Sequence, residues 1–409
     1  MNMKKISIDK ILNDLLALLV VLNFNTVYYF SSEYTSFNAI NKFLIILIIF
    51  LNISIDKVKR NKLKYGIKEI LLYYTYIIIF ALINNINGAY QVKEFFYYFI
   101  ILLPLFILFV YVKGKDGVIE LFKSFTKVIY IICIVSIVFY IFGGTLHFIP
   151  YTKYVNFTWS NRDQIRTYYN LYFETQYYGI GKKNILVARN SGIFCEPAMF
   201  AVMIIFAMMI NKMYMKNKKL YNIFFLINLI TTNSTTGIIM IIVYYVLDFI
   251  MDKKNRSIKL LIIPVLLYIS LCVVINIFLN KAGTSSGTTR VDDIVACTKA
   301  WLKRPIFGNG FLNNEIIIQN LSSFRKGNQG ISTSLFMVLA QGGIVLLSLY
   351  LYSFLKLLIY CIKTKCFNTL IALLIYGIIF VTTIFCYSAL EMYIVAIGIC
   401  SNIFYNKNK

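Results

Sequence analysis

One short stretch of the sequence combines residue types that could hold a charged substrate and transfer a proton. It occupies residues 189–197 and reads RNSGIFCEP. Pro197 is typical of the first turn of a helix, where its missing N–H costs nothing, and Glu196 would then lie at the positive end of the helix dipole. Helix position therefore explains the carboxylate but not the arginine seven residues before it. Because a charge at the start of an apolar helix is a functional hypothesis by default, we predict that Arg189 is the partner of Glu196.

A second stretch brings together basic and acidic residues. It contains Arg290, Asp292 and Asp293, and continues into residues 301–311, which read WLKRPIFGNGF. The planar guanidinium of an arginine such as Arg290 or Arg304 can hold two phosphate oxygens at once. The arginines of this stretch therefore predict anion binding.

The glycines of the same stretch belong to a turn rather than to a nucleotide-binding fingerprint. No strand precedes Gly308-Asn309-Gly310, and no long helix follows it. The spacing predicts a tight turn whose backbone N–H groups can approach an anion, with a plain loop turn as the alternative. We take Gly308 and Gly310 as candidate substrate-binding residues, together with Arg189, Arg304, Arg166 and Trp301.

The elements that position these residues must lie in a membrane. The chain of 409 residues is 59% hydrophobic and 14% charged, with a mean hydropathy of +0.72. A soluble chain carries about 25% charged residues, so this much apolar surface needs lipid as its solvent. The basic start of the chain leads into an apolar run without a small-residue cleavage site, which we interpret as a retained helix rather than a removed signal peptide.

Apolar runs long enough to cross the hydrocarbon core predict about twelve helices. Lys-rich clusters separate them on alternate loops, as the positive-inside rule expects of cytoplasmic loops, so both termini should be cytoplasmic. One span fewer would place the basic loop at 252–259 outside. We expect an all-α, polytopic membrane protein with one domain over residues 1–409. The spans are predicted at 11–30, 37–54, 68–87, 94–112, 126–146, 193–211, 220–234, 236–251, 259–279, 333–355, 367–386 and 388–405.

This topology also explains the net charge of +24. Most lysines and arginines lie in the cytoplasmic clusters, where they set orientation and contact anionic lipid, so a nucleic-acid partner is not expected. The eight cysteines form no CxxC pair and the chain has one histidine, so we predict neither a metal site nor a cofactor. Cys195 and Cys297 fall near the outer face, which leaves a disulfide between them open.

Two segments, at about 147–192 and 280–331, form long loops on the non-cytoplasmic side. Long loops are usually functional, so we look for chemistry there. Both loops carry positive charge, Arg166 included, against the topological rule; phosphate binding explains this charge, and solvated loop charge or headgroup contact is the alternative. The two tryptophans, Trp159 and Trp301, fall one in each loop. Aromatic faces suit sugar rings, although an interfacial aromatic belt explains any one of them more simply.

Four short motifs follow one another along the chain. They lie at residues 189–197, in the Thr-rich turn at 234–237, in Arg290 with the loop at 304–310, and at 340–344, which reads AQGGI. In this order, and with two large outer loops between many spans, they resemble the O-antigen and capsular repeat-unit polymerases (Wzy type) and the related O-antigen ligases. Each motif is short, so the resemblance rests on their order over most of the chain.

The chain departs from this family at two places. Ligases usually show a His-Asn pair before the helix with the Gly-Gly-Ile element, where this chain has Ser332-Thr333-Ser334. Its only histidine, His147, lies in the other loop. Many relatives also have Ser-Arg in the Thr-rich turn, where this chain has Ser234-Thr235. The missing histidine favours a polymerase over a ligase and leaves the general base unassigned.

The resemblance implies glycosyl transfer between two polyprenyl-diphosphate-linked oligosaccharides on the outer face of a bacterial inner membrane. A sugar hydroxyl of one would attack the anomeric carbon of the other with inversion, and polyprenyl diphosphate would leave, without metal or cofactor. Arg290, Arg189 and Arg304 would hold the diphosphate. Glu196 or Asp293 would assist the hydroxyl, with His147 as a further candidate. Donor, acceptor, membrane lipid and a chain-length regulator protein are the expected partners.

A transporter is the alternative from another class, either a flippase for lipid-linked oligosaccharide or a carrier of small solutes. Transporters place ionisable residues and broken helices near the middle of the membrane, often in two related halves. In this chain the charges fall mainly at the ends of the apolar runs. This distribution favours the enzyme.

Overall fold

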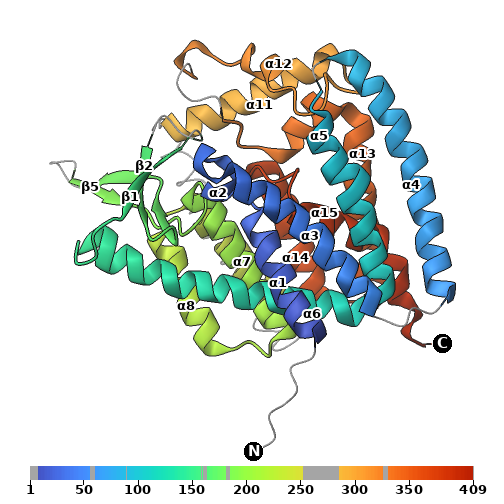
Figure 1. The fold of residues 1–409 in the computed structure, drawn as a ribbon, viewed down its shortest axis with the longest axis horizontal. Helices are drawn as coiled ribbons and strands as arrows, with labels where there is room; N and C mark the ends of the chain where they lie inside the picture. Colours follow the sequence, from blue (N-terminus) through green and yellow to red (C-terminus); the bar gives the residue numbers. More distant parts are fainter. Residues whose placement is uncertain are drawn as a thin grey trace, which may run out of the picture.

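The computed structural model describes residues 8–55, 60–88, 90–157, 159, 164–180, 185–251, 285–325 and 330–408. They form a mostly helical bundle around one continuous apolar core (Figure 1). Within these described ranges, five helical runs are long and apolar enough to cross a membrane, namely Ser32–Ile55, Tyr65–Asn87, Val92–Thr145, Pro197–Tyr214 and Ser334–Thr364. Shorter apolar helices are Lys219–Thr231, Thr235–Met251, Phe367–Thr382 and Ala389–Ile399. The predicted span at 259–279 lies outside the described residues.

The first predicted span, at 11–30, is not one helix. Helix α1 (Ile8–Leu22) stops before two asparagines, and the short α2 (Val27–Phe30) follows. Asn25 takes a positive φ of 36°, and its side-chain amide donates to the carbonyl of Ile384. Asparagine tolerates this backbone conformation and can bond groups outside the helix, so the chain turns here. Helices α3 (Thr35–Ile55) and α4 (Arg60–Asn87) then run beside the core.

The predicted spans at 94–112 and 126–146 form one helical run from Val92 to Thr145. Its parts are α5 (Val92–Phe95), the π-helical η2 (Phe96–Leu102), α6 (Leu103–Val138) and the π-helical η3 (Phe139–Thr145). Gly114 interrupts α6 with φ 63° and ψ −162°, a backbone conformation that only glycine adopts easily. The predicted connecting loop is therefore a sharp turn between two helical arms, and Figure 1 shows the second arm leaving in a different direction from α5.

The first long outer loop contains strands, which the all-α prediction did not include. Strands β1 (Lys153–Asn156), β2 (Gln164–Tyr168) and β3 (Tyr172–Glu174) form an antiparallel sheet. Strands β4 (Tyr177–Ile180) and β5 (Ile185–Ala188) pair separately. Positive φ angles at Tyr169 and Asn170 reverse the chain between β2 and β3. The aromatic and β-branched residues of this loop suit strands because they pack well on a pleated surface.

The second half of the chain supplies the remaining helices. Helix α7 (Pro197–Tyr214) leads through α8 (Lys219–Thr231) to α9 (Thr235–Met251). The second outer loop is partly helical, with α11 (Ser285–Lys303) and α12 (Glu315–Ile318). Helix α13 (Ser334–Thr364) is interrupted at Gly343, where φ is 65°. Helices α14 (Phe367–Thr382) and α15 (Ala389–Ile399) are separated by an extended segment, so the span predicted at 367–386 ends early.

Candidate active site

A cavity of about 100 Å³ lies where the start of α7, the first half of α11 and the end of α14 meet. Its wall contains Glu196, Arg290 and Asp293, the three residues predicted as catalytic. Trp159, Gln176 and Ser332 supply further polar groups. The fold thus brings the three predicted residues to one place from segments that are far apart in the sequence.

Glu196 is the N-cap residue of α7, with an extended backbone at φ −140° and ψ 146°. Its side chain makes no capping hydrogen bond to the first N–H groups of the helix. It instead accepts a hydrogen bond from the indole Nε1 of Trp159 on its Oε1 atom, at 2.8 Å. The carboxylate is half-buried, and its other oxygen makes no hydrogen bond with the described residues. The cavity side of Glu196 therefore retains the capacity to accept a proton.

Arg290 is held by two elements that the sequence separates widely. Its Nη1 atom donates to the carbonyl of Thr382 at 2.9 Å, and its Nη2 atom donates to the hydroxyl of Thr236 at 3.2 Å. Thr382 ends α14, and a cation is favourable at the negative end of a helix dipole. These two bonds use two of the five N–H groups of a guanidinium. The remaining donors can serve an anion in the cavity.

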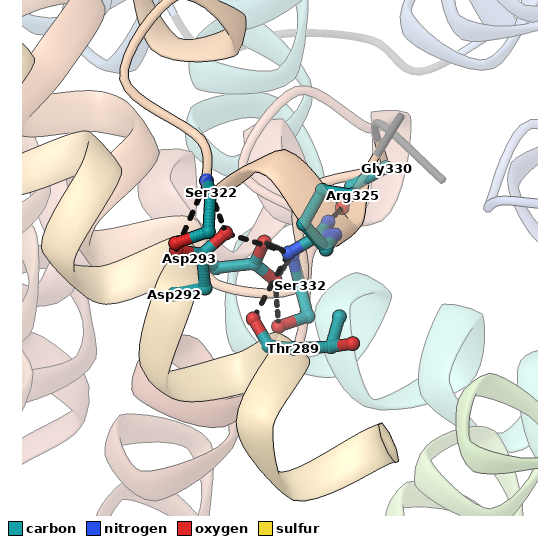
Figure 2. A network of polar contacts seen from close by, with 7 residues as sticks. All are labelled: Thr289, Asp292, Asp293, Ser322, Arg325, Gly330 and Ser332. Atoms are coloured by element: carbon teal, nitrogen blue, oxygen red, sulfur yellow. Dashed lines mark hydrogen bonds and ion pairs between the residues drawn. The ribbon is translucent and has the colours of Figure 1, made fainter. Parts of the chain in front are cut away.

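Asp293 belongs to a buried polar network, which Figure 2 shows. Its Oδ1 atom accepts from the Nη1 atom of Arg325 at 2.7 Å, and its Oδ2 atom accepts from the backbone N and the hydroxyl of Ser332 at 3.0 and 2.6 Å. Asp292 accepts from the backbone N and hydroxyl of Ser322, and lies 3.6 Å from Arg325. Arg325 also donates to the Gly330 carbonyl at 2.7 Å.

This network anchors residues 322–325 and 330–332 to α11. The side chains of Asp293 and Arg325 are 0% and 2% exposed, so each charge depends on the other. Burial raises the pKa of the Asp293 carboxyl above its ordinary value, while Ser332 and Arg325 act to lower it. Both oxygens of Asp293 are already bonded to protein groups. Of the two carboxylates in the cavity wall, Glu196 therefore accepts fewer hydrogen bonds from the protein.

Arg189 does not bond Glu196 directly. Its guanidinium donates to the side-chain oxygen of Gln176 at 2.9 Å and to the carbonyls of Thr232 and Asn233 at 3.1 and 2.9 Å. Burial lowers the pKa of Arg189, and the charge of Glu196 opposes this effect. The predicted pair is thus an electrostatic contact, in which Arg189 links Gln176 of the cavity wall to the turn between α8 and α9.

The neighbouring Asn190 explains why this segment is rigid. Its side chain is fully buried, donates to Asn228 and Thr231 at 3.0 and 2.9 Å, and accepts from Ser136 and from the backbone N of Gly192. An amide that satisfies so many groups fixes the chain on which it lies. The motif at 189–197 therefore bonds residues 231–233, just before the second motif at 234–237, and Arg290 of the third motif bonds Thr236 of the second.

The loop at 305–310 docks elsewhere, in the break of α13. The backbone N of Gly310 donates to the carbonyl of Gln341 at 3.2 Å, and that of Gly308 donates to the carbonyl of Arg304 at 3.0 Å. In return, the backbone N of Ile344 donates to the carbonyl of Pro305. The glycine N–H groups that were predicted to approach an anion are therefore bonded to the protein backbone, and this turn forms no part of the cavity wall.

The other predicted binding residues also lie outside the cavity. Arg304 is exposed. Trp301 donates from its Nε1 atom to the Pro305 carbonyl at 3.0 Å. Arg166 lies in β2, opposite Glu174 of β3, with its guanidinium 3.9 Å from that carboxylate and stacked over the ring of Tyr151. Trp301 and Arg166 thus bond or stack within the outer loops, and none of the three residues lines the cavity.

Sequence reasoning missed Trp159, Gln176 and Arg325 as parts of the site. Trp159 packs against the ring of Phe30, with 4.5 Å between the centroids, and this contact holds its indole over Glu196. The adjacent acids Asp292 and Asp293 were a usable signal, because two neighbouring carboxylates in a buried position need a cation. In the described part of the chain, no cluster of three or more His, Cys, Asp and Glu side chains could hold a metal ion. Cys195 and Cys297 are both free thiols.

No protein-family model matches the chain, and no curated protein matches it either.

Proposed function

We propose that this protein is a membrane glycosyltransferase that joins polyprenyl-diphosphate-linked oligosaccharide repeat units, as a polymerase of O-antigen or capsular polysaccharide. The observation that carries the proposal is the cavity in which a half-buried carboxylate, a guanidinium with unused donors and an indole come together, at Glu196, Arg290 and Trp159. Glycosyl transfer from a lipid diphosphate needs such a set. The carboxylate takes a proton, the cation stabilises the departing diphosphate and the aromatic group borders a sugar.

In the proposed reaction, the hydroxyl oxygen of the acceptor sugar forms a bond to the anomeric carbon of the donor. The bond from that carbon to the diphosphate oxygen breaks, and the electron pair leaves with polyprenyl diphosphate. Glu196 accepts the hydroxyl proton and later releases it to water. Arg290 hydrogen-bonds the diphosphate oxygen as its charge develops. A single displacement of this kind inverts the anomeric centre.

The proposed location is the outer face of a bacterial inner membrane, with about twelve spans and both termini in the cytoplasm. The lysine distribution supports this orientation. The cavity lies at the start of α7, whereas the cluster from Lys212 to Lys219 begins in the last turn of the same helix. If the Lys-rich ends face the cytoplasm, the cavity faces outward, where lipid-linked repeat units are presented. Partners in this proposal are donor, acceptor, membrane lipid and a chain-length regulator.

Deletion in the native host, followed by gel electrophoresis of the glycan, tests the proposal. We expect loss of the ladder of long chains with retention of single repeat units. Loss of every unit from the final carrier would instead identify a ligase, and an unchanged ladder would reject both enzymes. Complementation with the Arg290→Ala variant should leave the ladder absent at wild-type protein levels, and Arg290→Lys should restore it only in part, because a point charge cannot replace a planar fork.

A flippase is the second candidate, because two helices break beside the cavity. The break between α1 and α2 touches the break between α14 and α15, where Asn23 accepts from the backbone N of Ala389 at 2.9 Å. Discontinuous helices that meet in this way are common at transporter sites. Purified protein in vesicles distinguishes the two functions. A transferase extends a synthetic lipid-linked unit added on one side, and a flippase moves that unit across without extending it.

A further inference from the structure

Two further cavities lie away from the candidate active site, toward the other ends of α7 and α14. One of about 550 Å³ is bordered by the last turn of α7, the last turn of α9 and the junction between α13 and α14, and Lys212, Asp248, Lys365, Asn368 and Thr369 line it. The candidate active site uses the other end of each of α7 and α14. The two sites are therefore on opposite faces of the bundle and do not share residues.

This polar cavity has a basic character. Lys212 pairs with Asp248, which holds its ammonium group at the cavity, and Lys365 is exposed at the left-handed C-cap of α13. Among the described residues that line the polar cavity, the two lysines and the one aspartate sum to a net charge of +1. The first turn of α14 also faces this space, and its dipole adds to the preference for an anion. One monovalent anion matches this charge.

The polar cavity adjoins an apolar crevice of about 120 Å³. Three residues, Met213, Tyr214 and Thr369, line both spaces. The crevice passes between α6, α7, α13, α14 and α15, and its walls are otherwise apolar, with Phe206, Ala372 and Leu373 among them. Several of its side chains are only half-buried, so the crevice reaches the surface of the bundle. A charged cavity beside an apolar crevice matches the charged headgroup and the apolar acyl chain of a lipid.

We propose that this surface binds one anionic phospholipid of the membrane, with its phosphate between Lys212 and Lys365 and part of an acyl chain in the crevice. Three observations on the molecule support this occupant. The polar cavity carries one net positive charge, which suits a phosphodiester better than a diphosphate. The apolar crevice shares three lining residues with the polar cavity, and a free phosphate would not fill it. The Lys-rich ends of these helices lie where the positive-inside rule places anionic headgroups.

Native mass spectrometry of the purified full-length protein, titrated with defined lipids, tests the proposal. We expect phosphatidylglycerol to bind and phosphatidylcholine with the same chains to bind at least about tenfold more weakly. The double variant Lys212→Gln/Lys365→Gln should lose roughly twenty-five-fold in affinity for phosphatidylglycerol, which is the product of about fivefold for each lysine at an anionic membrane surface. Ala372→Phe should fill the crevice and weaken the lipid while sparing glycerol phosphate.

The double variant Lys219→Gln/Lys363→Gln is the matched control. It removes the same charge from exposed positions near the same helix ends that do not line either space. Its affinity should stay within about twofold of the wild type, and an equal loss would show that surface charge alone attracts the lipid. Displacement of the lipid by inorganic phosphate at equal concentration would assign the polar cavity to a free anion. Tighter binding of polyprenyl phosphate than of phosphatidylglycerol would assign it to the carrier lipid. Each of these results overturns the proposal.

Binding here is measured without any glycan substrate, so the outcome is independent of the proposed transferase activity. Melting curves of all variants in the same detergent establish that they are folded. A variant that binds no lipid although it melts like the wild type supports the site. Unchanged binding in both Lys212→Gln/Lys365→Gln and Ala372→Phe rejects it.

Discussion

The cavity around Glu196 and the turn at Gly308 and Gly310 in the break of α13 both contain residues that the sequence predicted as site residues, yet their bonding differs. At the cavity, Arg290 uses two of its donors and Glu196 accepts one hydrogen bond, so both can still bond a ligand. At the break, the amides of Gly308 and Gly310 bond backbone carbonyls, and Asn309 donates to the carbonyls of Ala300 and Ala340. A motif of charged or flexible residues therefore suggests a site, and the bonding capacity that the fold leaves unused identifies it.

The largest expected effect concerns the buried network that supports the cavity. Arg325→Met should lower the free energy of unfolding by about 3–5 kcal/mol, because it leaves Asp293 buried without its ion-pair partner. The triple variant Asp292→Asn/Asp293→Asn/Arg325→Met should recover most of this loss, since it removes the cation together with both carboxylates that face it. Denaturation of the purified variants in one detergent measures both values. A single variant as stable as the wild type would mean that Asp293 does not depend on Arg325.

Glu196→Gln tests the cavity itself. If Glu196 takes a proton, the variant should lose at least about a hundredfold in the rate of chain extension. If Glu196 serves only the helix dipole, the change should cost no more than about 0.3–1 kcal/mol of stability and leave the rate nearly intact. Purified protein with a synthetic lipid-linked unit separates turnover from expression. Asp293→Asn, measured beside it, should change stability more than turnover, because both of its oxygens are already bonded.

Gly308→Ala tests the break of α13. A Cβ atom there would lie 2.3 Å from the Gln341 carbonyl oxygen and 2.5 Å from the Gly342 nitrogen, at a φ of +71°. We expect a loss of about 1–3 kcal/mol in stability with an unchanged rate per folded molecule. Gly377→Ala is the control, since its Cβ would meet only the ring of Phe354 at ordinary contact distance. A reduced rate in a Gly308→Ala protein of normal stability would return this turn to the substrate site.

The smallest effect is expected at Arg304. Its side chain is exposed and lies outside the cavity wall, so Arg304→Ala should change stability by no more than about 0.5 kcal/mol and extension by less than about twofold. Extension assays of Arg304→Ala and Arg290→Ala compare two arginines that were both predicted to hold the diphosphate. Equal losses in both variants would mean that the loop at 304–310 moves to the cavity during turnover.

The sequence allowed prediction of the apolar helices and of the three residues that share the cavity. Local patterns carry this information, because apolar runs define helices and a proline after a glutamate marks a helix start. The interruptions were not predictable in the same way. Asn25 breaks a helix because of its bond to Ile384, and Trp159 reaches Glu196 across 37 positions of sequence. In the sequence, Arg325 resembles the other basic residues of its loop, and its ion pair with Asp293, 32 positions away, is formed only in the fold.

The contact between Asn23 and Ala389 has a consequence for how the protein is made. These residues are 366 positions apart, so α1 is synthesised long before the segment that completes its end. Until then the carbonyl of the buried Asn23 side chain lacks its backbone partner, which is costly in an apolar surrounding. Tyr393 of α15 then packs on Phe106 of α6, 5.1 Å between ring centroids, and closes the core. The bundle therefore matures late during translation, and chains that stop before α15 should be recognised by membrane proteases as unfinished.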